Sequence, residues 1–148
     1  RRDVDFRVGS HGRYEWTAGG EDHYVQFLPA WMANLEMTPE TLVAFMDQAG
    51  VATAILQNDH IYGNLAAQFA DAAKAHPGHF VGLAQVEEAF AYHDSELQRL
   101  EDEIRRLGMA GFYFTTTGMF RSGYQPMHSD PAYDPYWQLV EKSGLPVF

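Results

Sequence analysis

His128–Phe148, HSDPAYDPYWQLVEKSGLPVF, contains the signals for a helix followed directly by a strand. Asp134 is a good N-cap residue, and Pro135 at the first helical position lacks only an N–H that would have no partner there. Gly144 suits the left-handed conformation that ends many helices. The apolar segment Leu145–Phe148 follows at once, and we expect it to begin a buried strand.

Upstream of that stretch, amphipathic segments of helical length alternate with apolar segments of strand length. Thr38 and Pro39 mark one helix start, and Ser95 with Gln98 has the spacing of a capping box. We expect the charged run Glu101–Arg106 to be a solvated helix face. The predicted helices and strands cover residues 38–49, 51–56, 64–75, 80–86, 95–107, 111–114, 134–143 and 145–148.

This alternation predicts an α/β fold with a parallel sheet and helical crossovers. Two architectures fit it, an open doubly wound sheet or part of a (β/α)8 TIM barrel. QNDH at Gln57–His60 follows the first clear strand in place of a glycine-rich phosphate loop, which excludes dinucleotide binding. Residues 1–37 lack a clear period, so we expect an irregular aromatic loop before the repeating α/β units of 38–148, all within one domain, 1–148.

Composition narrows the classes of partner. The 148 residues have a formal net charge of -10 and a pI of about 4.9, so nucleic acid and anionic membranes are poor partners. The absence of cysteine excludes disulfides, zinc–thiolate sites and thiol catalysis. No apolar run reaches the length of a membrane span. We expect a cytoplasmic protein that binds a small molecule.

Four segments resemble, in the same order, the amidohydrolase-related family of metal-dependent barrel enzymes. This family contains aminocarboxymuconate-semialdehyde and resorcylate decarboxylases and dicarboxylate lactonases. The segments are TPETLVAFMDQAGVATAIL (38–56), HPGHFVGLAQ (76–85), ELQRLEDEIRRLGMAGF (96–112) and DPAYDPYWQLVEKSGLPVF (130–148).

The resemblance implies a (β/α)8 barrel in which the chain supplies strands two to five with their helices, and an active site at the carboxyl ends of the strands. It also implies a divalent metal ion, usually zinc, held by His and Asp side chains. The family takes ligands from a His-x-His pair on strand one, a His just after strand five, and strands six and eight. None of these has a counterpart here, so we assign no metal ligand to this sequence.

The implied activity is that of a metal-dependent hydrolase or a non-oxidative decarboxylase, a carbon–carbon lyase, acting on a small carboxylate or aromatic substrate. We expect the chain to be an internal fragment that is inactive by itself. Part of a barrel would leave strand edges unpaired, which favours self-association into a homo-oligomer.

Residues that follow the expected strands are the candidates for substrate binding, because barrels place their sites there. Arg121 offers a planar fork for a carboxylate, while Thr115 could bind substrate or satisfy backbone groups at a strand end. Each candidate has the alternative of an ordinary surface role, and we expect Glu87 to be solvated. The candidates are Asn58, His60, Thr115, Arg121 and His128; no catalytic residue is assigned.

The alternative function is that of a complete, small, open α/β binding module without catalysis. The encoding gene distinguishes the two. A reading frame that continues past Phe148 and soon encodes a His, with a His-x-His before Arg1, supports the enzyme. A start codon just before Arg1 and a stop codon after Phe148 support the binding module.

Overall fold

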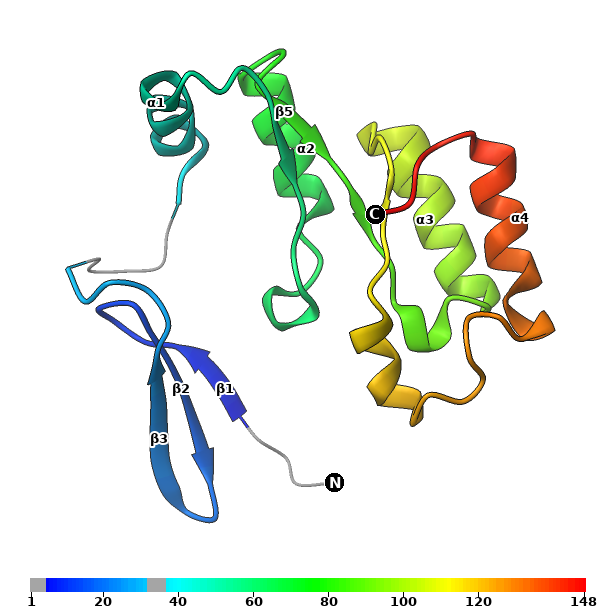
Figure 1. The fold of residues 1–148 in the computed structure, drawn as a ribbon, viewed down its shortest axis with the longest axis horizontal. Helices are drawn as coiled ribbons and strands as arrows, with labels where there is room; N and C mark the ends of the chain where they lie inside the picture. Colours follow the sequence, from blue (N-terminus) through cyan, green and yellow to red (C-terminus); the bar gives the residue numbers. More distant parts are fainter. Residues whose placement is uncertain (1–4, 32–36) are drawn as a thin grey trace. The chain divides into compact units, whose positions relative to one another are not determined.

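The computed structural model describes residues 5–31 and 37–148, and its contacts divide the chain into two compact units, residues 1–42 and 43–148. The first unit contains an antiparallel sheet, and the second contains parallel strands with helices between them (Figure 1). This division departs from the single domain that we expected over residues 1–148. None of the helices in the described ranges is long and apolar enough to cross a bilayer.

The described part of the first unit contains a three-stranded sheet in the order β1-β2-β3, so the irregular loop predicted over residues 1–37 is wrong for residues 5–26, while residues 1–4 and 32–36 lie outside the described part. Adjacent strands are antiparallel. Gly19 and Gly20 connect the second and third strands with φ of 64° and 84°, as a tight hairpin turn requires. These glycines resembled loop residues in the sequence. The strands are β1 (Asp5–Val8), β2 (Arg13–Ala18) and β3 (Glu21–Gln26).

The strands of the second unit are parallel and follow one another in sequence order. β4 (Ala54–Leu56) pairs with β5 (Phe80–Gly82), and β6 (Ala84–Gln85) pairs with β7 (Phe112–Tyr113). Only one residue separates β5 from β6, so they form a single interrupted strand. A parallel bridge from Phe112 to Val147 then adds the last segment. The predicted parallel α/β arrangement is confirmed.

β4 is shorter than the strand predicted over residues 51–56, and its side chains are only partly covered. The strand begins at Ala54 rather than Val51, and the side chain of Ile55 is 51% exposed. Among the described residues, β4 pairs along one edge only, with β5. This strand is therefore not buried on both faces, whereas both residues of β6 are buried.

Helices connect the successive strands of the second unit. α3 and α4 lie side by side (Figure 1). Gly108 and Gly144 end them in the left-handed conformation, as expected for Gly144. Asp134 lies in the first turn of its helix and is not the N-cap. The helices are α1 (Pro39–Ala49), α2 (Ala66–Ala75), α3 (Asp94–Leu107) and α4 (Asp134–Ser143). The boundary between the two units falls within α1.

The core of the second unit contains side chains from β6, β7, α3 and α4. Leu100, Phe112 and Tyr136 have no exposed surface, and the rings of Phe112 and Tyr136 meet edge-on with centroids 6.0 Å apart. Burying a side chain of this size stabilises the folded state by about 1.5–3 kcal/mol. The two neighbouring helices are thereby packed against β6 and β7.

A short 3-10 turn follows the carboxyl end of each of three neighbouring strands. η1 (His60–Tyr62) follows β4, η2 (Glu88–Phe90) follows β6, and η3 (Thr116–Ser122) follows β7. Carboxyl ends of parallel strands lie at the same edge of a sheet. The three turns and the residues before them therefore form one surface.

Candidate functional site

An open pocket of about 370 Å³ lies at this surface. Three of the five residues proposed from the sequence line it: His60 from the loop after β4, and Thr115 and Arg121 from the loop after β7. The other lining residues are Asp59, Glu87, Thr117, Gly118 and Phe120.

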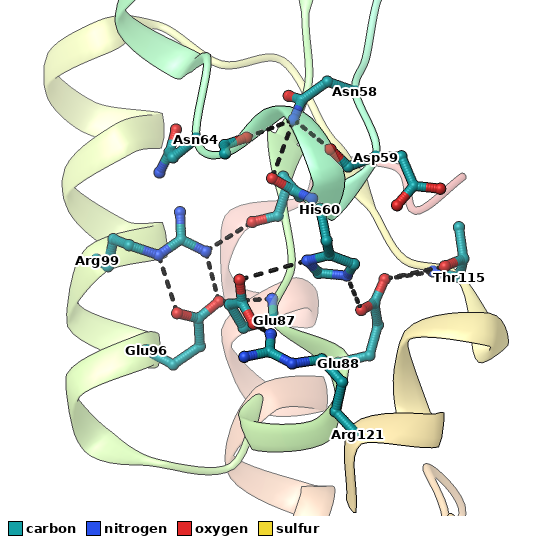
Figure 2. A network of polar contacts seen from close by, with 12 residues as sticks. Asn58, Asp59, His60, Asn64, Glu87, Glu88, Glu96, Arg99, Thr115 and Arg121 are labelled. Atoms are coloured by element: carbon teal, nitrogen blue, oxygen red, sulfur yellow. Dashed lines mark hydrogen bonds and ion pairs between the residues drawn. The ribbon is translucent and has the colours of Figure 1, made fainter. Parts of the chain in front are cut away.

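His60 lies between two glutamates (Figure 2). Its Nε2 is 2.5 Å from Oε2 of Glu88, and its Nδ1 is 3.3 Å from Oε1 of Glu87. The hydrogen bond to Glu88 raises the pKa of His60 above its ordinary value of 6.5, while burial opposes the shift. Both ring nitrogens face carboxylates, so the site favours the imidazolium, which donates from each.

Glu88 is the buried centre of the site, with 1% of its surface exposed. Its Oε1 accepts hydrogen bonds from the backbone N–H of Thr115 at 2.8 Å and from the Thr115 hydroxyl at 3.2 Å. With His60 on Oε2, the carboxylate has three donors, which offset the loss of hydration. The carbonyl of Glu88 also accepts from the Tyr133 hydroxyl at 2.7 Å.

Gly118 allows η3 to approach the His60–Glu88 pair. A Cβ at this position would lie 1.8 Å from Oε2 of Glu88 and 2.9 Å from Nε2 of His60. Real side-chain contacts do not reach such distances, so any other residue would push the His60–Glu88 pair apart. Glycine is needed at this position for close approach.

Arg121 forms an ion pair with Glu87, which also lines the pocket (Figure 2). The two side chains are 40% and 36% exposed. The guanidinium carbon also lies 5.4 Å from the centroid of the Phe90 ring, within the range of a cation–π contact. Glu87 is therefore partly solvated as expected, but it also bridges two cationic side chains.

Thr115 has the structural role that the sequence left open. Its N–H and hydroxyl both bind Glu88, so the hydroxyl fixes a buried carboxylate while the residue still borders the pocket.

Asn58 and His128 do not line the pocket. Asn58 is 7% exposed, and its Nδ2 donates to the carbonyl of Gly63 at 2.6 Å, which closes the loop around η1. The carbonyl of His128 accepts from the indole N–H of Trp137 at 2.9 Å, and its ring lies against Phe114. The structure thus separates these two candidates from the other three.

A second polar network holds the backbone at Gln85 and Glu87, just before η2. Arg99 donates to both oxygens of Glu96, to Glu103 at 2.5 Å and to the carbonyl of Gln85 at 2.6 Å. Burial by itself would lower the pKa of Arg99, but Glu96 and Glu103 outweigh it and raise the pKa. Glu103 is 6% exposed, so its assignment to a solvated face was wrong. Glu96 also accepts from the N–H of Glu87 at 2.9 Å and so fixes the backbone beside the pocket.

The donor groups of the pocket do not form a metal site. Across residues 5–31 and 37–148, no group of three or more His, Asp or Glu side chains is placed to hold an ion. Both nitrogens of His60 already bind carboxylates. The metal that the family resemblance implies therefore does not fit the described residues.

No family model matches the sequence, and no curated protein matches it. Solved structures do resemble the fold. 2,6-dihydroxybenzoate decarboxylase from Rhizobium has a TM-score of 0.58 and 22% identity over 77% of this chain. 5-carboxyvanillate decarboxylase from Sphingomonas paucimobilis has a TM-score of 0.53 and 24% identity over 80% of this chain. The same enzyme from Novosphingobium aromaticivorans, with bound manganese, has a TM-score of 0.53 and 19% identity over 78% of this chain.

These similarities establish the class of fold. The chain is a mixed α/β arrangement of the TIM-barrel type, so the predicted part of a (β/α)8 barrel is confirmed at the level of fold. The particular proteins that it resembles are decarboxylases of aromatic carboxylates. The chain spans 39%, 37% and 34% of the lengths of the three structures in the order given.

Proposed function

We propose that this chain forms part of the barrel of a non-oxidative decarboxylase that acts on an aromatic carboxylate. The supporting observation is the pocket at the strand ends, where His60 and Arg121 converge, in a fold whose solved relatives include decarboxylases of this type. The relatives favour decarboxylation over hydrolysis, the other activity of the resembled family. The cytoplasm remains the expected location.

The residues of this chain would bind and orient the substrate. A guanidinium presents two parallel N–H groups that match a carboxylate, and an imidazolium adds a third donor. Phe120, which is 62% exposed at the pocket, provides an apolar surface for a flat ring. A divalent ion, zinc or manganese, supplies electrophilic assistance in enzymes of this kind when bound, and its ligands would have to come from other residues.

A titration of the chain with 2,6-dihydroxybenzoate, followed by NMR amide shifts, tests the proposal. We expect the largest shifts around His60 and Arg121. Arg121→Ala should weaken binding about tenfold or more, because a hydrogen bond to a charged group contributes about 1.5–3 kcal/mol.

Arg105→Ala is the matched control, because the side chain of Arg105 is 76% exposed and pairs with Asp102 on its own helix. It should bind the ligand as the parent chain does. Shifts distributed evenly over the surface, or equal affinity in the Arg121→Ala variant, would contradict the proposal.

A further inference from the structure

Two cationic groups from separate turns meet on one carboxylate at the mouth of the pocket. Oε1 of Glu87 lies 3.3 Å from Nδ1 of His60, and Oε2 of Glu87 pairs with the guanidinium of Arg121 (Figure 2). We call His60 and Arg121 the cation pair. The geometry matches what a bound carboxylate would need, with donors on both oxygens.

The two glutamates beside His60 differ in how firmly they are held. Glu88 is 1% exposed and has three donors on its carboxylate, so displacing it would leave buried charges unpaired. The Glu87 side chain is 36% exposed and its partner Arg121 is 40% exposed. Ion pairs of that exposure contribute only about 0.2–1 kcal/mol. A ligand can therefore displace the carboxylate of Glu87 but not that of Glu88.

The backbone at Glu87 does not need to move for this exchange. Its N–H is fixed by Oε1 of Glu96 at 2.9 Å, and Arg99 holds that glutamate in turn. Rotation of the Glu87 side chain toward solvent frees the guanidinium of Arg121 and removes one of the two side chains at Nδ1 of His60, the other being the amide of Gln85 at 3.0 Å. His60 stays in place because Glu88 and Thr115 hold its other side.

We propose that the cation pair is the binding site for the carboxylate of a small ligand, and that Glu87 is an internal competitor for it. Glu88 is a positioning residue that keeps Nδ1 of His60 directed at the ligand. This inference rests on the proposed function for its ligand class, but it extends to simple carboxylates such as benzoate.

The local charges give the direction of the effect. The ionisable groups at the pair are Asp59, Glu87 and Glu88 against His60 and Arg121. With Glu87 ionised, three carboxylates face two cations, which disfavours another anion. Neutralising Glu87 balances the charges and frees the donors of the cation pair.

Glu87→Gln tests the proposal, because it keeps the size of the side chain and removes its charge. Benzoate binding, measured by NMR titration, should tighten about two- to fivefold, the factor that corresponds to the loss of one exposed ion pair. The ¹⁵N resonance of His60 Nδ1 should move on binding while that of Nε2, which faces Glu88, stays nearly constant.

Glu101→Gln is the control, because it removes the same charge from an exposed pair with Lys142, 3.4 Å apart, on another part of the surface. Its affinity should equal that of the parent chain. Equal tightening in both variants would indicate a general charge effect and would overturn the proposal, as would unchanged affinity in Glu87→Gln. Glu87→Ala provides a second test of the same competitor.

A comparison of ligands separates this inference from the proposed function. If benzoate binds more tightly to Glu87→Gln but 2,6-dihydroxybenzoate has no preference for the pocket, the carboxylate site stands and the aromatic substrate class fails. If 2,6-dihydroxybenzoate binds there and Glu87→Gln changes nothing, the substrate class stands and the internal competitor is refuted.

Discussion

Glu88→Gln tests the buried half of the site most directly. The amide has the size of the carboxylate, and its oxygen can still accept from Thr115. Its NH2 group, however, would face Nε2 of His60, which lies 2.5 Å from the present oxygen. Two donors would then meet, so the variant loses a charge-assisted hydrogen bond worth about 1.5–3 kcal/mol. We expect the free energy of unfolding to fall by about 2–3 kcal/mol below neutral pH.

The pH dependence of the loss follows from the pKa of His60. Because the folded-state pKa is raised above 6.5, the stabilisation is fully present below pH 6.5 and disappears as the pH rises through the folded-state pKa. Urea unfolding of the parent chain and of Glu88→Gln, followed by circular dichroism at about pH 6 and about pH 9, measures the free energy of unfolding of each. The free energy of unfolding of the variant should fall furthest below that of the parent chain at the lower pH.

Glu101→Gln serves again as the control, since the exposed pair with Lys142 should contribute less than about 1 kcal/mol. A loss in Glu88→Gln no larger than in this control, or a loss that is the same at both pH values, would refute the reasoning about the His60–Glu88 pair.

Two further predictions concern the same region. Gly118→Ala should lower the free energy of unfolding by about 1–3 kcal/mol and shift the His60 imidazole resonances, because the new Cβ would overlap Oε2 of Glu88. Thr116 on the same turn is exposed, so Thr116→Ala is the control and should have little effect. A stable Gly118→Ala variant with unchanged resonances would argue against this packing. Calorimetry of the chain with zinc should show no tight, stoichiometric binding, because both ring nitrogens of His60 already face carboxylates. One tightly bound ion per chain would contradict the assignment of metal ligands to other residues.

Local signals were sufficient for most elements of the second unit. The capping residue at Thr38, the glycine at 144 and the apolar strands predicted α1, α4 and the parallel sheet, since these depend on neighbouring residues. The first unit was missed because its Gly19-Gly20 hairpin turn was taken for a loop. The alternation along Arg13–Ala18 was the signal that could have identified its central strand.

The candidate site was predicted only in part. His60, Thr115 and Arg121 were selected because each follows a strand, and that rule depends only on the order of elements. Glu88 and Gly118 were missed because a glutamate in a loop is usually solvated and a glycine usually marks a turn. Nothing in the local sequence shows that Glu88, in the loop after β6, and Gly118, in the loop after β7, approach each other.

The amino-acid sequence by itself determined the alternation of helices and strands, their parallel direction, and the edge of the sheet at which functional side chains collect. These follow from periodicity and capping, which act over a few residues. Only the tertiary structure decided that Glu88 is buried against His60, that Glu87 spans the cation pair, and that Asn58 and His128 lie outside the pocket. Such contacts join residues that are tens of positions apart, and their geometry is set by packing of the whole unit.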